Sequence, residues 1–470
     1  MHRWIAAALL AAWALAARAD GPVRMVKLGG LADDPRTQAH VANARSLGFN
    51  ALWLYTYQAG RWTEAEAPQG PSLSRPFLRL ARECRKTGTE LWVSVNPVEE
   101  MKERFVFAGE SGERGVRAIV AFAKLLRKKG GVRHFVLSFD DQPINLAELS
   151  DIFTYGLSAA PAHLDLVRRV RAALPADIDL WMCPSTYCDA HLGDGTTPYA
   201  KAFLSGLSSV PESVGIIWTG PRVVSPSITR ADLAATRARL GGRRLFLYDN
   251  FPGEGGGPDG LALVLGALRN RDPELVREIQ AYLALPMDLL GASRLPLATQ
   301  ADFLRDPAAY DPDASVARAI ARLAGGNREA ADALTTQQLE WGGWVGGRNY
   351  WTWFDMSAEV VAERLGDPAF VESFTWTVAR YPGRMRALEG LADVPFRDDL
   401  LLVMARRLAV ARALPLTIEY LARVRAGRAD ASEVLAQIDR ERASWAHAPD
   451  TAHVLDIFLA TAGVPTGTPR

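Results

Sequence analysis

The chain is poor in the residues that mark several protein classes. Only three cysteines occur among 470 residues, which excludes a framework of disulfide bridges and leaves room for one bridge at most. The formal net charge of +1 gives no reason to expect nucleic acid or an anionic membrane as a partner. The seven histidines show no spacing to cysteine that predicts zinc, and we expect neither a metal nor another cofactor. A hydrophobic content of 49% excludes a disordered chain.

Long apolar runs are also scarce, and the one that stands out lies at the N-terminus. Met1-His2-Arg3 is a short basic start, Trp4 to Ala16 is apolar, and Ala17-Arg18-Ala19 is a small-x-small cleavage site. This is the layout of a secretory signal peptide, and the run is too short for a transmembrane helix. We therefore expect residues 1–19 to be a signal peptide, the mature protein to be periplasmic or secreted, and no membrane span to remain. A retained N-terminal anchor is the alternative.

Short apolar runs alternate with amphipathic helical patterns over residues 22–310. The runs are rich in β-branched or aromatic residues, as buried parallel strands are. They are Val23–Leu28, Ala51–Tyr55, Glu90–Val95, Arg133–Phe139, Ile178–Cys183, Val214–Trp218, Arg244–Tyr248 and Ala281–Leu285. The helical patterns between them include Thr37–Leu47, Arg75–Thr87, Gly115–Lys129, Leu164–Leu174 and Thr229–Leu240. Eight such units predict an α/β fold, a (β/α)8 TIM barrel.

A doubly wound open sheet is the structural alternative for this region. Such a fold usually has fewer strands and a glycine fingerprint after the first one. Here Gly29-Gly30-Leu31 follows the first run and does not match that fingerprint. The barrel is therefore the favoured interpretation.

Residues 311–470 show helical patterns without intervening strands. These patterns are Asp313–Leu323, Arg328–Leu339, Ala358–Leu365, Arg397–Leu414, Leu416–Arg425 and Ala431–Trp445. They predict an α-helical C-terminal domain. Trp341-Gly342-Gly343-Trp344 and Tyr350-Trp351-Thr352-Trp353 concentrate aromatic rings, which can contact a sugar face or pack inside the protein. Both interpretations stay open.

Polar side chains follow the ends of the predicted strands. In a (β/α)8 barrel these ends meet at one face, where active sites lie. The residues concerned are Asn96, Asp140, Asp141, Thr186, Tyr187, Thr219, Asp249 and Asn250. We expect them to converge on one cleft, although each taken alone also suits a turn or a helix N-cap.

The adjacent carboxylates Asp140 and Asp141 are the expected catalytic centre. Two carboxylates in one low-dielectric site do not easily ionise together, so one suits an acid and the other a base or an orienting group. Glycosidic cleavage needs such a pair. The competing interpretations are a magnesium site, a helix cap, and a remnant in a non-catalytic binding protein.

Four blocks in the same order resemble glycoside hydrolase family 84, the β-N-acetylglucosaminidases that include O-GlcNAc hydrolases. The blocks are Val132 to Asp141 (ending Ser138-Phe139-Asp140-Asp141), Met182-Cys183-Pro184-Ser185-Thr186-Tyr187, Ile217 to Val224 (with Trp218-Thr219-Gly220) and Tyr248-Asp249-Asn250-Phe251-Pro252. They lie on four successive predicted strands, and the resemblance covers residues 23–310. It implies a carbohydrate or glycoconjugate substrate.

The resemblance also implies a mechanism and a set of contacts. In that family the 2-acetamido group of the sugar attacks its own anomeric carbon, an exception to the usual two-carboxylate retaining scheme. By resemblance, Asp140 orients the acetamido group and Asp141 acts as general acid and then general base. The implied substrate contacts are Tyr187, Cys183, Thr219, Trp218, Tyr248 and Asn250.

The blocks that bind the sugar hydroxyls in the family differ here. Its Gly-Phe-Tyr-Gly-Arg-Pro-Trp block falls on Gly29-Gly30-Leu31-Ala32, and its strand-two Lys block falls on Tyr55-Thr56-Tyr57-Gln58. Gly29 and Gln58 are the expected contacts there, with Glu254 and Asp259 as further candidates. A site that loses such contacts loses selectivity for that sugar. A non-catalytic glycan-binding protein, or a hydrolase of a different modified or polymeric sugar, stays an alternative.

Overall fold

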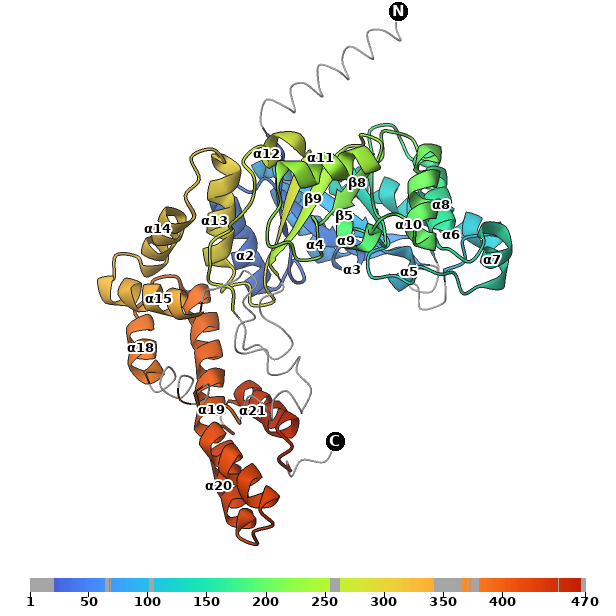
Figure 1. The fold of residues 1–470 in the computed structure, drawn as a ribbon. Coiled ribbons are helices and arrows are strands. Elements are labelled where there is room, and N and C mark those ends of the chain that lie inside the picture. Colours follow the sequence, from blue (N-terminus) through green and yellow to red (C-terminus); the bar gives the residue numbers. More distant parts are fainter. Residues whose placement is uncertain are drawn as a thin grey trace, which may run out of the picture. The chain divides into compact units, whose positions relative to one another are not determined.

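The computed structural model describes residues 21–63, 67, 69–100, 105–253, 263–341, 366–369, 372, 380–446 and 448–465. The predicted signal peptide, Glu254, Asp259, the helical pattern Ala358–Leu365 and most of the tryptophan-rich segment lie outside these residues. The chain divides into two compact units (Figure 1). The first runs to Phe251 and includes Leu268–Pro286 and Gln300–Tyr310. The second consists of Pro252–Ala267, Met287–Thr299 and the chain from Asp311 onward.

Eight parallel strands of the first unit close into a barrel, in the order β1-β10-β9-β8-β7-β6-β5-β2. The strands are β1 Val23–Lys27, β2 Ala51–Tyr55, β5 Glu90–Val95, β6 His134–Ser138, β7 Asp179–Cys183, β8 Gly215–Trp218, β9 Leu245–Pro252 and β10 Ala281–Leu285. A short antiparallel pair, β3 Gly60–Arg61 and β4 Ser72–Leu73, lies in the connection between β2 and β5. Each predicted run contains or overlaps one barrel strand, so the predicted TIM barrel is confirmed.

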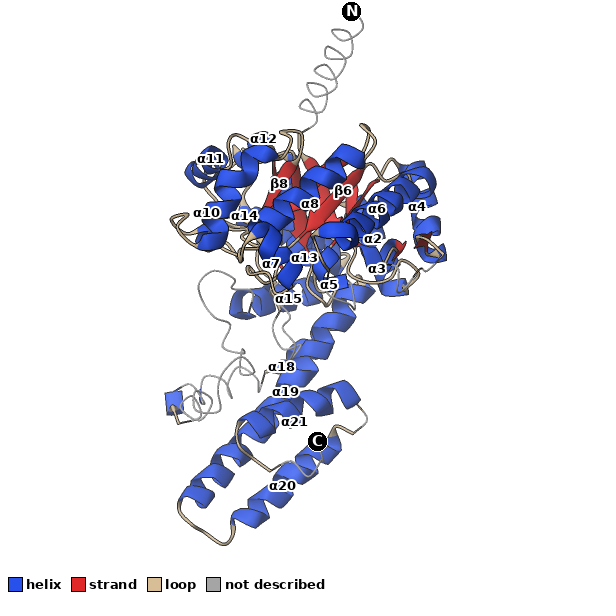
Figure 2. Cartoon of the chain, turned by 90° about the vertical axis from the view of Figure 1, so that its right-hand side faces the viewer, coloured by secondary structure: helices blue, strands red, loops and turns tan. Residues whose placement is uncertain are grey.

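Helices connect the strands and surround the barrel (Figure 2). They are α2 Pro35–Ser46, α3 Thr56–Ala59, α4 Arg75–Thr87, α5 Pro97–Glu100, α6 Gly109–Leu125 with the π-helical turn Leu126–Gly130, α7 Leu149–Tyr155, α8 Ala160–Ala173, α9 Asp189–Leu192, α10 Pro198–Gly206 with the 3-10 turn Leu207–Ser209, α11 Arg230–Arg239, α12 Leu275–Glu278 and α13 Arg294–Arg305. Helix α4 shows why these boundaries fall where they do. Its N-cap Ser74 accepts a hydrogen bond from the Phe77 amide, and Gly88 ends it with a φ of 68°.

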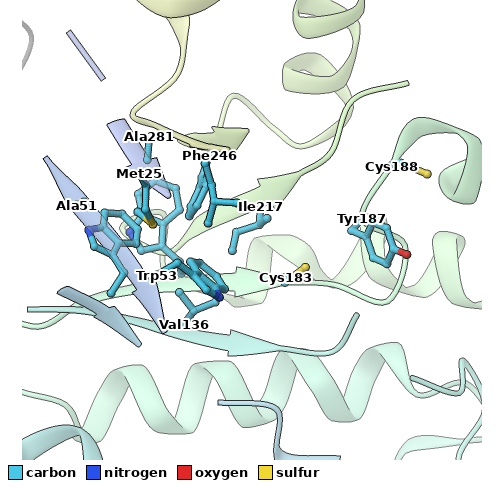
Figure 3. Packing of buried hydrophobic residues seen from close by; sticks show 13 residues of the cluster. Met25, Ala51, Trp53, Val136, Cys183, Tyr187, Cys188, Ile217, Phe246 and Ala281 are labelled. Carbon is cyan, nitrogen blue, oxygen red and sulfur yellow. The ribbon is translucent and has the colours of Figure 1, made fainter. Parts of the chain in front are cut away.

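Large aromatic side chains fill the barrel interior. Trp53 and Trp92 are paired in register on β2 and β5, and Phe246 reaches them from β9. Their rings pack edge to face, with centroids 5.6 Å apart for Trp53 and Phe246 and 5.5 Å apart for Trp92 and Phe246. Figure 3 shows this packed core, with Cys183 at its edge and Tyr187 beyond it. The interior is a filled core, so chemistry belongs to the barrel end.

A cluster of charged residues lies where β5, β6 and β7 begin. His134 Nε2 lies 3.3 Å from Glu90 Oε2, and His134 Nδ1 lies 3.4 Å from Asp179 Oδ2. Arg244 Nη2 approaches Asp179 Oδ1 to 2.6 Å. Burial opposes the charged form of His134, but hydrogen bonds to Asp179 and Glu90 raise its pKa above the ordinary value. Burial likewise opposes the charged carboxylates, yet hydrogen bonds to His134 lower the pKa of both Glu90 and Asp179.

The second unit is helical in its C-terminal part, as predicted. Its helices are α14 Pro312–Ala324, α15 Arg328–Trp341, α18 Tyr381–Leu388, α19 Val394–Arg425, α20 Ala431–Ser444 and α21 Pro449–Thr461. Within the described ranges, no helix combines the length and apolar character needed to cross a bilayer.

One boundary expectation in this unit is wrong. The predicted helices Arg397–Leu414 and Leu416–Arg425 are a single helix, α19, with Pro415 inside it. An interior proline costs a helix about 3 kcal/mol. The buried side chains of Val410, Ala413 and Leu414 offset that cost, because α19 packs against α20 and α21.

Candidate active site

The loop after β6 carries Asp140 and Asp141 past the C-terminal end of the barrel. The Phe139 amide donates to the Cys183 carbonyl at 2.8 Å, which extends the pairing with β7 by one residue. The chain then turns sharply, and Asp141 has a φ of 57°. Among residues with a side chain, Asp and Asn tolerate this left-handed conformation best. The turn lets two neighbouring carboxylates leave the strand in different directions, which a regular strand could not do.

Asp140 interacts with side chains from four strands, β2, β6, β7 and β9. Ser138, two residues earlier on β6, donates a hydrogen bond from its hydroxyl to Asp140 Oδ1. Burial raises the pKa of Cys183, Tyr55 and Tyr248, and the charge of Asp140 adds to the rise in all three. All three groups therefore stay protonated at neutral pH.

Asp141 is exposed, and its carboxylate is hydrogen-bonded by a residue of the loop after β7. The Tyr187 hydroxyl donates to Asp141 Oδ1 at 2.8 Å, while the Tyr187 ring is only 8% exposed. Burial raises the pKa of Tyr187, and the hydrogen bond to Asp141 raises it further. Tyr187 is therefore a permanent donor beside a solvent-accessible carboxylate, an arrangement suited to proton transfer.

Thr219 and Asn250 are buried and shape the loop after β8. Thr219 Oγ1 donates to the Arg222 carbonyl at 3.0 Å, and Asn250 Nδ2 donates to the Val223 carbonyl at 2.6 Å. The Thr219 amide also donates to the Tyr187 carbonyl at 2.9 Å. These bonds tie the loops after β7 and β8 to strand β9 next to Tyr187.

Two predicted contacts are engaged elsewhere. Gln58 is 1% exposed; its Nε2 donates to the Gly30 carbonyl at 2.8 Å, and its Oε1 accepts from the Tyr55 amide at 2.9 Å. Both ends of this amide therefore bind main chain, because α3 begins directly after β2. Trp218 is 1% exposed, and it points outward from the barrel, since its neighbour Ile217 packs in the interior. Gly29 has a φ of 79° and is exposed at the turn after β1.

Asp249 does not reach the cleft where we expected it. β9 runs on to Pro252, so Asp249 lies inside a strand and faces away from the interior. Its carboxylate binds Arg271 at 2.8 and 2.9 Å and accepts from the Tyr282 hydroxyl at 2.7 Å. This buried ion pair fixes β9 against β10 and the segment before α12.

Three residues of the site escaped the sequence analysis. The Lys27 ammonium lies 4.9 Å from the centroid of the Tyr55 ring. Lys27, Tyr55 and Ser138 are each the last residue of their strand. Counting alternate positions along the predicted strands would have found them, because side chains two apart share a face.

The described residues contain no group of three or more His, Cys, Asp or Glu placed to hold a metal ion. Cys84, Cys183 and Cys188 all lie in described segments, and each is free and buried, so the single bridge that the count allowed does not form.

Comparison with known proteins agrees with this arrangement. A family model described as NAGidase, beta-N-acetylglucosaminidase, matches residues 56–337. The fold is similar to that of a mutant of the Thermobaculum terrenum O-GlcNAc hydrolase, with a TM-score of 0.63 and 18% identity over 94% of each chain. It is also similar to CpGH84B, with a TM-score of 0.61 and 16% identity over 95% of this chain and 74% of that one. Because the family model spans more than half of the sequence, the chain belongs to the β-N-acetylglucosaminidase family of glycoside hydrolases.

Proposed function

We propose that this glycoside hydrolase cleaves a β-linked 2-acetamido sugar by substrate-assisted catalysis with retention, and that it works in the periplasm or outside the cell. The observation that carries the proposal is the division of partners between two adjacent carboxylates. Ser138 binds Asp140, whereas Tyr187 binds Asp141, which is exposed.

Asp140 suits the orienting role. A carboxylate next to buried neutral donors accepts a hydrogen bond readily, and the N–H of a 2-acetamido group is such a donor. Holding that N–H turns the acetamido oxygen toward the anomeric carbon, so that the sugar supplies its own nucleophile. The hydrogen bond from Ser138 fixes the direction of the Asp140 carboxylate, and Cys183 is paired in register with Ser138 on the neighbouring strand.

Asp141 suits proton transfer. It protonates the leaving oxygen in the first step and removes a proton from water in the second, as a general acid and base on one residue. The Tyr187 hydroxyl has one proton, which it donates in a hydrogen bond to Asp141 in the free site. When substrate binds, this hydroxyl turns from Asp141 and donates to the acetamido oxygen as charge develops there.

The test is hydrolysis of an aryl 2-acetamido-2-deoxy-β-glucoside. We expect turnover by the wild type and a fall in kcat/KM of about 100- to 10,000-fold in Asp141→Asn. A thiazoline mimic of the cyclic intermediate should inhibit the wild type competitively. An active enzyme that the thiazoline leaves untouched would contradict substrate assistance. Glycan binding without any turnover would favour a non-catalytic binding protein.

The compartment needs its own measurement. We expect the mature chain to begin at Asp20, since cleavage follows Ala19 in the predicted signal peptide. Mass spectrometry of the protein recovered from the periplasmic or culture fraction gives its N-terminus. Recovery of a chain that retains Met1 in the cytoplasmic fraction would contradict export.

A different sugar is the second candidate substrate, and the position of Gln58 favours it. The Gln58 side-chain amide, which was predicted to replace a hydroxyl-binding group, is hydrogen-bonded to the main chain of Gly30 and Tyr55. Comparing kcat/KM for aryl 2-acetamido glucosides and galactosides decides between the candidates, because a site with paired hydroxyl contacts separates such epimers strongly.

A further inference from the structure

The segment after the carboxylate pair has an inverted polarity. Ile144, Leu149, Phe153 and Leu157 are 44%, 68%, 86% and 60% exposed, whereas Asp151 in the same segment is 1% exposed. Helix α7 thus turns Leu149 and Phe153 to solvent and its carboxylate to the protein. An ordinary surface helix does the reverse, and grouped exposed apolar side chains indicate a binding surface.

The buried polar side fixes this segment in place. The Asp151 carboxylate accepts hydrogen bonds from the Phe107 amide at 3.0 Å and the Ala108 amide at 2.7 Å. The Tyr155 hydroxyl donates to Asp165 Oδ2 at 2.9 Å. Because these bonds hold Asp151 and Tyr155 against the protein, the position of the exposed face of α7 is fixed as well.

The apolar surface begins beside the carboxylate pair. Ile144 follows Asp141 by three residues, so their Cα atoms lie within about 11 Å of each other. The Leu146 amide donates to the Leu157 carbonyl at 2.8 Å, which brings Leu157 next to this stretch. Leu149 and Phe153 extend the surface along α7. Figure 2 shows α7 at the same end of the barrel as α3 and α5, the short helices that follow β2 and β5.

The charge of the segment limits what binds there. Residues 142–158 contain Glu148 and the buried Asp151 but no Lys or Arg. A surface for an anionic group or an anionic membrane carries cations. Here the segment has no cation, and Glu148 is its one charged side chain that is not fully buried, so the surface fits an uncharged apolar group.

We propose that Ile144, Leu149, Phe153 and Leu157 bind an apolar, uncharged aglycone of the substrate, such as an alkyl chain or an aromatic group. The inference rests on the proposed function, because protonation of the glycosidic oxygen by Asp141 places the leaving group on the Asp141 side of the cleft. Ile144 is the first exposed large apolar side chain after Asp141, and the main-chain bond from Leu146 holds Leu157 near it. Substrates of this class are glycosides whose sugar is joined to a hydrophobic partner.

The test compares methyl and octyl 2-acetamido-2-deoxy-β-glucosides below the micellar concentration of the octyl compound. One fully buried methylene is worth about fourfold in binding, so partial burial of the chain should raise kcat/KM by at least about tenfold over the methyl glycoside. The octyl-to-methyl ratio should fall toward one in Leu149→Ser and in Phe153→Ser. Leu339→Ser, at a leucine 76% exposed on α15, is the matched control and should keep the wild-type ratio.

The outcomes separate this inference from the proposed function. Hydrolysis of both glycosides with equal kcat/KM overturns the aglycone surface and leaves the proposed function standing. If neither glycoside is hydrolysed, the proposed function fails, and calorimetric binding decides the inference: octyl binding no tighter than methyl overturns it. Sedimentation of the wild type and of Phe153→Ser tests whether a second copy of the chain, and not an aglycone, occupies this surface. A wild-type dimer that becomes monomeric in the variant, with the ratio unchanged, makes the surface a contact between copies and overturns the inference.

Discussion

Tyr187 and Asp141 are joined by a hydrogen bond of 2.8 Å that spans 46 residues of sequence and links the loops after β7 and β6. The bond has a fixed direction, because burial and the neighbouring carboxylate keep the phenol protonated at neutral pH. Asp141 therefore receives a donor whose position depends on the barrel and not on its own loop. Such support is what the proton transfer proposed for Asp141 needs, because this carboxylate is exposed to solvent.

Replacing Tyr187 by Phe removes that donor and keeps the ring. A hydrogen bond to a charged group is worth about 1.5 to 3 kcal/mol. We expect kcat/KM on the aryl glycoside to fall by about 10- to 150-fold, with most of the loss in kcat. Tyr310→Phe, which loses a hydroxyl bonded to the Leu268 carbonyl at 2.7 Å, is the control for removing a phenol elsewhere. Equal losses in both variants would assign Tyr187 a structural role only.

Ser138→Ala removes the donor to Asp140 with little change in volume. We expect a fall in kcat of about tenfold, because the orienting carboxylate loses one fixed direction. Ser94 offers a matched change: it is fully buried at the level of Tyr55, and its hydroxyl has no hydrogen-bond partner. Ser94→Ala should leave kcat unaltered. A Ser138→Ala enzyme with wild-type kcat would mean that Asp140 is held well enough without this bond.

The charged cluster at the start of β5, β6 and β7 predicts a pH dependence of stability. The folded pKa of His134 is raised, so its contribution is complete below the unfolded value of about 6.5 and is lost as pH rises through the folded value. The pKa values of Glu90 and Asp179 are lowered, so their contributions are complete above about pH 4.5 and are lost as pH falls. The cluster is strongest between these limits.

Thermal unfolding of wild type and His134→Gln from pH 5 to pH 8.5 measures this. The Tm difference should be largest at the acidic end of that range and shrink above neutrality. A constant Tm difference across the range would show that His134 acts through packing on Trp92, 4.2 Å away between ring centroids, and not through its charge.

The Asp249–Arg271 pair predicts a stability effect without a catalytic one. Both side chains are almost completely buried, and Asp249→Ala leaves the guanidinium without its partner. Breaking a buried pair on one side costs about 3 to 5 kcal/mol. Urea unfolding should show a loss of that order, whereas Glu274→Ala, at the exposed pair with Arg277, should cost under about 1 kcal/mol. A loss of kcat in a fully folded Asp249→Ala protein would place Asp249 in the site after all.

The barrel strands were predictable because a buried parallel strand is an almost continuous apolar run, as Ala51–Tyr55 is. The predicted helix boundary at Pro415 was wrong because a proline disfavours a helix locally, whereas α19 is held together by packing against α20 and α21, which lie farther along the chain. Leu149 and Phe153 are spaced as a buried helical stripe would be, so their exposure could not be read from spacing.

The candidate site divides in the same way. Asp140 and Asp141 are recognisable because two acids directly follow an apolar run. Gln58 is not, because its surroundings depend on where α3 begins. The sequence alone does not distinguish a glutamine whose amide binds nearby main chain from one whose amide binds a ligand. The bond from Ser138 to Asp140 forms only if Ser138 lies on the inward face of the strand and its side chain adopts a suitable rotamer. The alternation of strand residues predicts the face, but the sequence does not predict the rotamer.

The left-handed conformation of Asp141 restricts how this enzyme can change by single substitutions. Asn and Gly accept that conformation at low cost, whereas a β-branched residue does not. A descendant that replaced Asp141 and kept this turn would therefore carry Asn or Gly at this position. For the same reason Asn is the replacement that tests the proton transfer proposed for Asp141, since its amide cannot act as an acid or base and it preserves the turn.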